Sequence, residues 1–329
     1  MGKSSVYFKD WLVRDYREGD EIEISKLFKI VFKKELSLAF WRWRFKDNPD
    51  GVGIIKLLFD RDNLIGHYSV IPRLVQIGKS EKKCAFSMTT MTHPNYQKQG
   101  IFTFLAREVY KVCKDVGYNF VYGFPNRNSY HGFVSRLGWK DTVLINKIYK
   151  LLKKNRVNLQ KNTGDVYEIS EFDDDINLFW RRVRDEYRII VPRTKDYLNW
   201  RFVDNPDIDY KKYIFMRKNE VLGYIVLKIY NANRVKGGHI VDILSAKEND
   251  VVRDLLVHSY GYFLQNSINY VSCWMQKGYF YNDIFEEEGF IRQEEETWFG
   301  HTLLAKEEDI SDTNTLNDWY LTMADSDVY

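Results

Sequence analysis

Residues 93–105 read HPNYQKQGIFTFL, a polar segment that runs directly into an apolar helical pattern. A strand is expected to end at Met91 or Thr92, and apolar residues then recur at helical spacing as far as Gly117: Ile101, Phe104, Leu105, Val109, Val112 and Val116. The free N–H groups of the first turn, the helix dipole and the small Gly100 favour a bound anion, and Lys98 adds a positive charge. The segment therefore predicts either an anion-binding loop or an ordinary strand-to-helix connection with a glycine turn.

The composition is that of a soluble globular protein, and 329 residues suggest two domains of about 150 residues each. A net charge of +3 is too small to indicate nucleic acid as the main partner. No apolar run approaches membrane-spanning length, so we expect a cytoplasmic protein without membrane insertion. The six histidines are scattered, which predicts no metal site. We expect the three cysteines to be buried thiols: Cys84, Cys113 and Cys273.

An internal repeat divides the chain into two similar halves. Residues 43–50 read WRFKDNPD and residues 200–207 read WRFVDNPD, and the offset of 157 positions persists to Gly66 and Gly223. The chain is thus expected to use one module twice. The predicted modules span 1–150 and 165–329, with a polar connection around 150–165.

Each half shows the same order of expected elements. A helix (about 20–33, and 174–187) precedes the WRF segment, and two strands follow, joined by a turn at 60–63 or 217–220. A strand, a long helix, a strand and a last helix complete each half. This order predicts a mixed sheet, antiparallel at first and β-α-β-α at the end, in an α/β or α+β fold.

The repeat also separates structural motifs from functional ones. Trp43, Arg44 and Asp47 recur in the second copy, so we interpret them as structural, with an Arg-to-Asp pair and a proline turn. The glycine loop does not recur. Its counterpart at 246–252 reads AKENDVV, and the acidic Glu248 and Asp250 would repel a phosphate. We therefore expect an anion site in the first copy alone.

The stretches SMTTMTHPNYQKQGIFTFLA (87–106) and FVYGFPNRNSYHGFVSRLGW (120–139) resemble the GCN5-related N-acetyltransferase (GNAT) superfamily. In that family a Q/R-x-x-G-x-G/A loop holds the pyrophosphate of acetyl-CoA, and two strands part to admit the pantetheine arm. Here Phe102 departs from the second small residue of the loop. The W-R-F and GFPN stretches also resemble tandem-GNAT proteins of bacterial surface polysaccharide synthesis. The resemblance implies this set of cofactor-binding residues: Met91, Thr92, Gln97, Lys98, Gln99, Gly100, Ile101, Phe102 and Asn126.

Two of these implied roles have ordinary structural alternatives. Asn126 follows a strand at a helix start, where it contacts CoA or caps the helix. The family's usual tyrosine, an acid for the leaving thiolate, is replaced here by Val134. Tyr130 lies one turn earlier, but Tyr281 matches it in the second copy, so aromatic packing is the alternative. A water-mediated route for the proton is equally open.

Other candidate catalytic residues come from the chain itself. The pKa of His67 suits a base, although a lone strand histidine is more often a packed residue. The last stretch, WYLTMADSDVY (319–329), places Asp325 and Asp327 after an apolar run. If this tail docks between the modules, these carboxylates could bind or deprotonate an ammonium group; the alternative is a solvated terminus.

The sequence thus predicts an acetyl-CoA-dependent N-acyltransferase with two GNAT-like modules, of which the first binds acetyl-CoA as co-substrate. The predicted acceptor is a small amine, with an amino sugar as the leading choice from the resemblance alone. One alternative is an aminoacyl transferase of the peptidoglycan-bridge type, which does not need a pyrophosphate loop. Another is a non-catalytic acyl-CoA-binding module, which Val134 would suit. The oligomeric state is left open.

Overall fold

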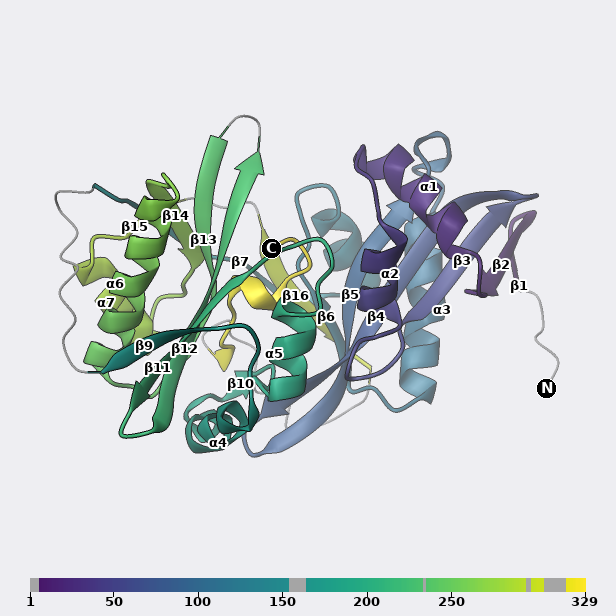
Figure 1. The fold of residues 1–329 in the computed structure, drawn as a ribbon. Helices are drawn as coiled ribbons and strands as arrows, with labels where there is room; N and C mark the ends of the chain where they lie inside the picture. The colour runs from purple at the N-terminus through teal and green to yellow at the C-terminus, as the bar shows by residue number, and fades with distance from the viewer. Residues whose placement is uncertain (1–5, 154–163, 233–234, 294–296, 305–317) are drawn as a thin grey trace. The chain divides into compact units, whose positions relative to one another are not determined.

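The computed structural model describes residues 6–153, 164–232, 235–293, 297–304 and 318–329. Most of the predicted connection, 154–163, lies outside these ranges. The residues group into two compact units. The first comprises 1–75, 81–143 and 297–314, and the second comprises 76–80, 144–296 and 315–329. Both units contain a mixed sheet with helices, as the sequence predicts (Figure 1).

The first unit is built on a sheet with the strand order β1-β2-β3-β4-β5-β6-β16-β7. β5 and β6 pair in parallel, whereas β1 to β4 form an antiparallel series. The strands are β1 Val6–Phe8, β2 Trp11–Asp15, β3 Ile54–Asp60, β4 Asn63–Ile77, β5 Ser80–Thr92, β6 Phe120–Gly123, β7 Lys140–Leu144 and β16 Trp298–Leu303. The helices are α1 Glu21–Phe32, α2 Leu38–Phe45, α3 Ile101–Asp115, the 3₁₀ turn η1 Pro94–Tyr96 and the π-helical η2 Gly132–Arg136.

Helix α3 packs on this sheet through the apolar stripe that the sequence predicts. The buried residues of α3 include Leu105, Ala106 and Val109, and they share one core with residues of β3, β4 and β6. Gly66 on β4 permits the close approach, because a Cβ atom there would lie 2.7 Å from Ile101 Cγ2. The start of α3 is thereby held against the sheet.

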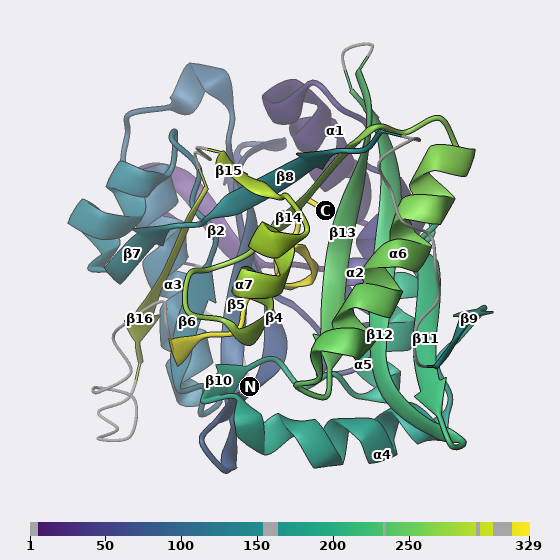
Figure 2. The same cartoon turned by 90° about the vertical axis from the view of Figure 1, so that its left-hand side faces the viewer.

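The second unit contains a sheet with the strand order β15-β8-β14-β13-β12-β11-β9. Figure 2 shows α6 and α7 in front of this sheet. The strands are β8 Lys147–Leu151, β9 Asp165–Ile169, β11 Lys211–Arg217, β12 Glu220–Ala232, β13 Val235–Ser245, β14 Tyr270–Trp274 and β15 Ile291–Gln293, and the short β10 Ile189–Ile190 pairs with the end of β4. The helices are α4 Asp174–Val183, α5 Lys195–Phe202, α6 Asn249–Gln265, α7 Phe280–Glu287 and the 3₁₀ turns η4 Arg184–Glu186 and η6 Met323–Asp325.

The sequence repeat is also a repeat of backbone structure. Helices α2 and α5 have equal lengths, and their N-caps, Ser37 and Thr194, each accept a hydrogen bond from the third residue of the helix. The β3–β4 and β11–β12 pairs shift register at corresponding places, after Leu58 and after Phe215. These features lie 157 positions apart, so the WRF segment caps the same helix in both copies.

The chain order of the strands differs from a simple division at 1–150 and 165–329, which stays a prediction about separate domains. β8 lies within 1–150 but pairs with β14 in the second unit. β16 lies within 165–329 but pairs with β6, from Gly300–Gly123 to Leu303–Phe120. A strand belongs to the sheet that supplies its hydrogen-bond partners, and sequence position does not determine this.

Two smaller expectations concern side chains. The three cysteines are buried free thiols, as predicted. The WRF motif is only partly as expected, because the ion pair of Asp47 is to Arg42, at 3.7 Å, and Arg201 donates to backbone carbonyls instead. In the ranges that the structure describes, no helix is long and apolar enough to cross a membrane.

Candidate functional site

Strands β5 and β6 part just before the glycine loop. Their last parallel pair is Ser87–Gly123, and Thr89 then has a positive φ of 50°. This conformation is unfavourable for a β-branched residue, so neighbouring groups must hold it. Two side chains of β4 do so: Ser69 Oγ donates to the Met88 carbonyl at 2.8 Å, and His67 Nδ1 donates to the Thr89 carbonyl at 2.7 Å. Met91 and Thr92 follow this irregularity at the end of β5.

His67 is neutral in this setting. Its ring is 1% exposed, and burial lowers its pKa to about 4. Because Nδ1 donates to a carbonyl, Nε2 is the unprotonated nitrogen, and it has no hydrogen-bond partner among the described residues. A group with this pKa is a weak base near pH 7, and its evident contact is with the backbone of Thr89. Catalysis by His67 stays a prediction.

The glycine loop leads from η1 to α3 with two residues in the left-handed region, Lys98 (φ 61°) and Gly100 (φ 86°). Gly100 is the N-cap and has no side chain to cap the helix, so the first N–H groups of α3 lack an intrahelical acceptor. Gln97, Lys98 and Gln99 are exposed. Because the first turn of α3 contains no acidic residue, the loop presents N–H groups and one lysine to solvent.

Phe102 departs from the small residue of the family loop, and its surroundings explain how the chain accommodates it. Its ring packs 5.0 Å from that of Phe133 and 5.8 Å from that of Tyr68. A Cβ atom at Gly132 would lie 2.9 Å from Phe102 Cε1. The large side chain on α3 thus lies over a glycine of η2 and points away from the exposed loop. The predicted last helix of the first copy is accordingly a short π-helix.

Asn126 and Tyr130 lie beyond β6 in the first unit. Asn126 Oδ1 accepts hydrogen bonds from the backbone of Asn128 and Ser129, at 3.0 and 3.2 Å, which is the capping role that the sequence left open. The Tyr130 ring packs on Trp298, with ring centres 4.9 Å apart. These contacts account for both residues structurally, and their roles toward CoA or thiolate stay predictions.

The corresponding helix start in the second unit is occupied by protein charges. Arg217 Nη1 lies 2.6 Å from Glu248 Oε2, and Arg217 Nη2 also pairs with Asp250. Two carboxylates therefore lie at the start of α6, where the dipole favours negative charge. The single guanidinium leaves this site with a net negative charge, which disfavours a phosphate.

The tail carboxylates lie in the second unit. Asp325 is buried and forms a two-point ion pair with Arg193, and Asp327 is half-buried. Asp325 would have to leave this pair before it could accept a proton from an amine. The structure thus groups the predicted loop residues, Met91 and Thr92 in the first unit and both tail aspartates in the second. A catalytic role for either aspartate stays a prediction.

Sequence reasoning missed several residues of these sites. Ser69 and Thr89 carry no pattern that distinguishes them from other strand residues. Arg193 did carry a signal, because its counterpart at the repeat offset is Leu36, next to the equivalent cap residue. A charge present in one copy alone was the criterion already used for the glycine loop.

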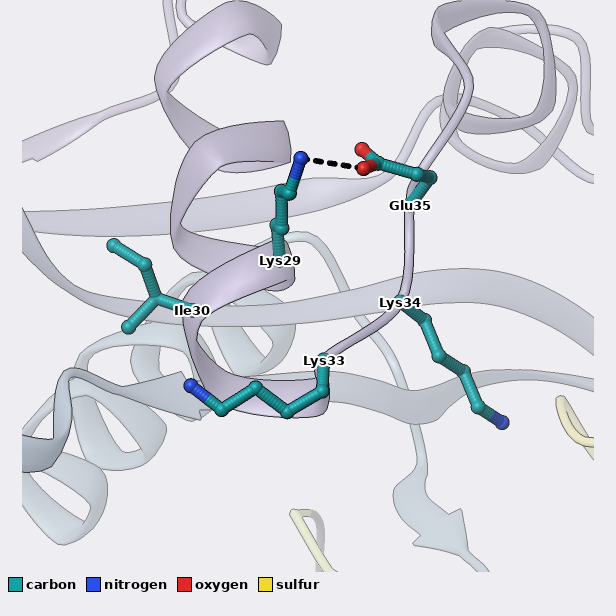
Figure 3. Close-up of a pocket in the computed structure, with 5 residues that line it drawn as sticks. All are labelled: Lys29, Ile30, Lys33, Lys34 and Glu35. Carbon is teal, nitrogen blue, oxygen red and sulfur yellow. Dashed lines mark ion pairs between the residues drawn. The ribbon is translucent and has the colours of Figure 1, made fainter.

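A shallow pocket lies at the end of α1, lined by Lys29, Ile30, Lys33, Lys34 and Glu35 (Figure 3). Lys29 pairs with Glu35 at 2.6 Å, and both side chains are mostly exposed. Solvent screens such a pair and its neighbours. We assign no ligand to this pocket.

Comparisons with known proteins agree with this geometry. A protein-family model described as an acetyltransferase (GNAT) domain matches residues 12–141. The chain is similar in structure to a GCN5-related N-acetyltransferase from Anabaena variabilis (TM-score 0.70, 9% identity, 90% of this chain and 73% of that one). It is also similar to Saccharomyces cerevisiae N-myristoyltransferase with bound myristoyl-CoA (0.65, 9%, 92% and 80%). A third similar structure is a tandem GNAT protein from the clavulanic acid biosynthesis pathway (0.62, 9%, 91% and 100%).

At these identities the structural likeness shows the fold alone. A comparison with curated proteins found no match. The family match contains the parted strands, the glycine loop and α3, and the fold is one that serves acyl-CoA-dependent acyl transfer. Residues 12–141 therefore form an acyltransferase domain of the GNAT family, in a chain with the fold of a tandem GNAT protein.

Proposed function

We propose that this protein transfers an acetyl group from acetyl-CoA to the amino group of a small acceptor, and that its first unit alone binds CoA. An amino sugar is the acceptor class to test first, since the W-R-F and GFPN stretches resemble tandem-GNAT proteins of surface polysaccharide synthesis. The membership of residues 12–141 in the GNAT family supports the reaction type. Surface polysaccharide synthesis is the proposed setting of the reaction.

One observation carries the proposal: the two equivalent helix starts differ in charge. The start of α3 has a left-handed glycine and no acidic residue in its first turn. The start of α6 has Glu248 and Asp250, both paired with Arg217. Backbone N–H groups at an uncapped helix start bind a pyrophosphate, whereas carboxylates at the same place repel it.

The proposed reaction needs few side chains. The free amine attacks the thioester carbonyl, the C–S bond breaks, and the amine proton passes to water or to a base while the thiolate takes up a proton. A backbone N–H of Met91 or Thr92 would donate to the oxyanion. The irregularity at Thr89, held by His67 and Ser69, would orient this end of β5. Tyr130 is retained as a candidate acid for the thiolate.

The loop can be tested with a charged substitution and a matched neutral one. Gly100→Glu and Gly100→Gln introduce side chains of nearly equal size, and both incur the strain of a positive φ. The space beside Gly100 is open, because the nearest atom to a Cβ at this position would be Phe8 Cζ, 3.6 Å away. We expect Gly100→Glu to weaken CoA binding at least about tenfold more than Gly100→Gln, because a carboxylate repels the pyrophosphate. Titration calorimetry measures the difference.

Equal affinities in the two variants would place the phosphate site elsewhere. Catalysis is tested separately, by thiol release from acetyl-CoA with a panel of small amines that includes amino sugars. CoA binding without thiol release for any amine would favour the non-catalytic acyl-CoA-binding alternative.

A further inference from the structure

The segment Asp318–Tyr329 is unusually well buried for a peripheral stretch of chain. Every residue from Trp319 to Ser326 is buried, and Met323 and Leu321 are at most 1% exposed. In Figure 1 this segment (yellow) lies beside α5 and β13 of the same unit. Its surroundings therefore show what the second unit recognises.

The segment lies at the place where β13 and β14 part. These strands pair in parallel at only two positions, Gly238–Val271 and His239–Ser272. The Tyr329 ring contacts both strands, 4.9 Å from the His239 ring and 5.3 Å from the Trp274 ring. Further along β13, Tyr320 Oη donates to the Ile243 carbonyl. The segment thus spans the opening between the two strands.

A buried charge anchors the segment. Arg193 Nη1 and Nη2 donate to the two carboxylate oxygens of Asp325, each at 2.8 Å. Asp242 of β13 lies 3.1 Å from Arg193 Nε and accepts from Thr322 Oγ1 at 2.8 Å. The side chains of Arg193, Asp242 and Asp325 are fully buried. A bidentate pair in such surroundings is directional and specific for a carboxylate.

The backbone of the segment is bound as well. Arg201 donates to the carbonyls of Ala324, at 3.1 Å, and of Ser326, at 3.4 Å, and it also contacts the Tyr329 carbonyl. The Tyr320 N–H donates to the Ile189 carbonyl at 2.8 Å, and Trp319 forms a parallel bridge with the same residue. Backbone hydrogen bonds combined with a side-chain anchor are the way in which proteins bind extended peptides.

The anchor is particular to the second copy. Arg193 corresponds to Leu36 at the repeat offset, whereas the cap residues that follow them, Thr194 and Ser37, are equivalent in structure. The repeated module therefore does not need a guanidinium at this position in order to fold. The charge is present where the segment binds.

We propose that the second unit is a peptide-binding module, and that its ligand is the chain's own segment 318–329, held as a tethered peptide in the opening between β13 and β14. An added peptide of the same sequence exchanges for the tethered one. The recognised chemistry is a short acidic peptide with aromatic residues before a Thr-x-x-Asp turn. This inference is independent of the proposed acyl transfer.

The experiment uses the full chain with a site-specific protease sequence inserted after Asn314. After cleavage, the C-terminal fragment should stay bound in a one-to-one complex by native mass spectrometry. A fluorescent peptide of residues 315–329, added in excess, should then replace it. The peptide with Asp325→Asn should bind at least about tenfold more weakly, because it leaves Arg193 buried with an incomplete pair.

The matched control is the peptide with Asp318→Asn. Asp318 pairs with the half-exposed Arg188 at 3.2 Å, so its loss should change affinity by at most about fivefold. Three results would overturn the proposal. The cleaved fragment could separate at once without rebinding, the Asp325→Asn peptide could bind as well as the parent, or the cleaved chain could lose its native near-UV circular dichroism, which would make the segment an inseparable part of the core.

Discussion

At the scale of single residues, the contact between His67 and Thr89 decides how a histidine in the candidate site acts. The imidazole is buried and neutral, and its one protonated nitrogen is used to hold a carbonyl of β5. A catalytic base and a holder of the backbone respond differently to substitution. The two roles can therefore be separated.

We expect His67→Asn to retain kcat within about tenfold, because the asparagine amide can donate from nearly the position of Nδ1. Removal of a general base would instead lower kcat by about 10² to 10⁴. His67→Leu leaves the Thr89 carbonyl without its donor and should lower the free energy of unfolding by about 1–3 kcal/mol. Steady-state kinetics and urea unfolding of both variants check this, and a collapse of kcat in His67→Asn would show that His67 is the base.

The same residue gives a pH dependence of stability. Its pKa falls from 6.5 in the unfolded chain to about 4 in the folded protein, so the unfolded state binds the proton first as pH falls. The stabilisation is complete above pH 6.5 and is lost toward pH 4, at about 1.4 kcal/mol per pH unit. Between pH 7 and pH 5 the free energy of unfolding should drop by about 2 kcal/mol more in the wild type than in His67→Asn. Urea titrations at both pH values test this, and parallel pH profiles would contradict it.

At the scale of elements, the packing of α3 on η2 depends on a large residue facing a glycine. Gly132→Ala should cost about 1–3 kcal/mol, because the new Cβ would lie 2.9 Å from Phe102 Cε1. In a Phe102→Ala background that clash is absent, and the same substitution should cost little. The difference is a coupling free energy, measured by urea unfolding of the two single variants and the double variant. An equal cost of Gly132→Ala in both backgrounds would mean that the two residues do not interact.

These elements also show what a single sequence can predict. The helix of residues 101–115, the turns at 60–63 and 217–220 and the repeat follow from local periodicity and chain order, and the structure contains them. The π-helix and the positive φ of Thr89 depend on partners 30 and 22 positions away, Phe102 and His67. The sheet to which β8 and β16 belong depends on pairing that local patterns do not encode. The loop of the candidate site was accessible because the second copy supplied a comparison.

At the scale of the whole molecule, one fold occurs twice with different occupants. The first copy keeps an uncapped helix start with a glycine and a lysine. The second copy places two carboxylates and Arg217 at its helix start, and its own segment 318–329 at the parting of β13 and β14. The repeat thus accounts for why a chain with two similar modules should have one CoA site.

The number of CoA molecules bound per chain tests this account most directly. Titration calorimetry on the full chain should give a stoichiometry near one, and Gly100→Glu should remove the heat of binding while Gly100→Gln retains a measurable part of it. Glu248→Gln, at the second helix start, should leave both affinity and stoichiometry unchanged. A stoichiometry near two, or CoA found at residues 246–252, would contradict the claim that only the first unit binds CoA.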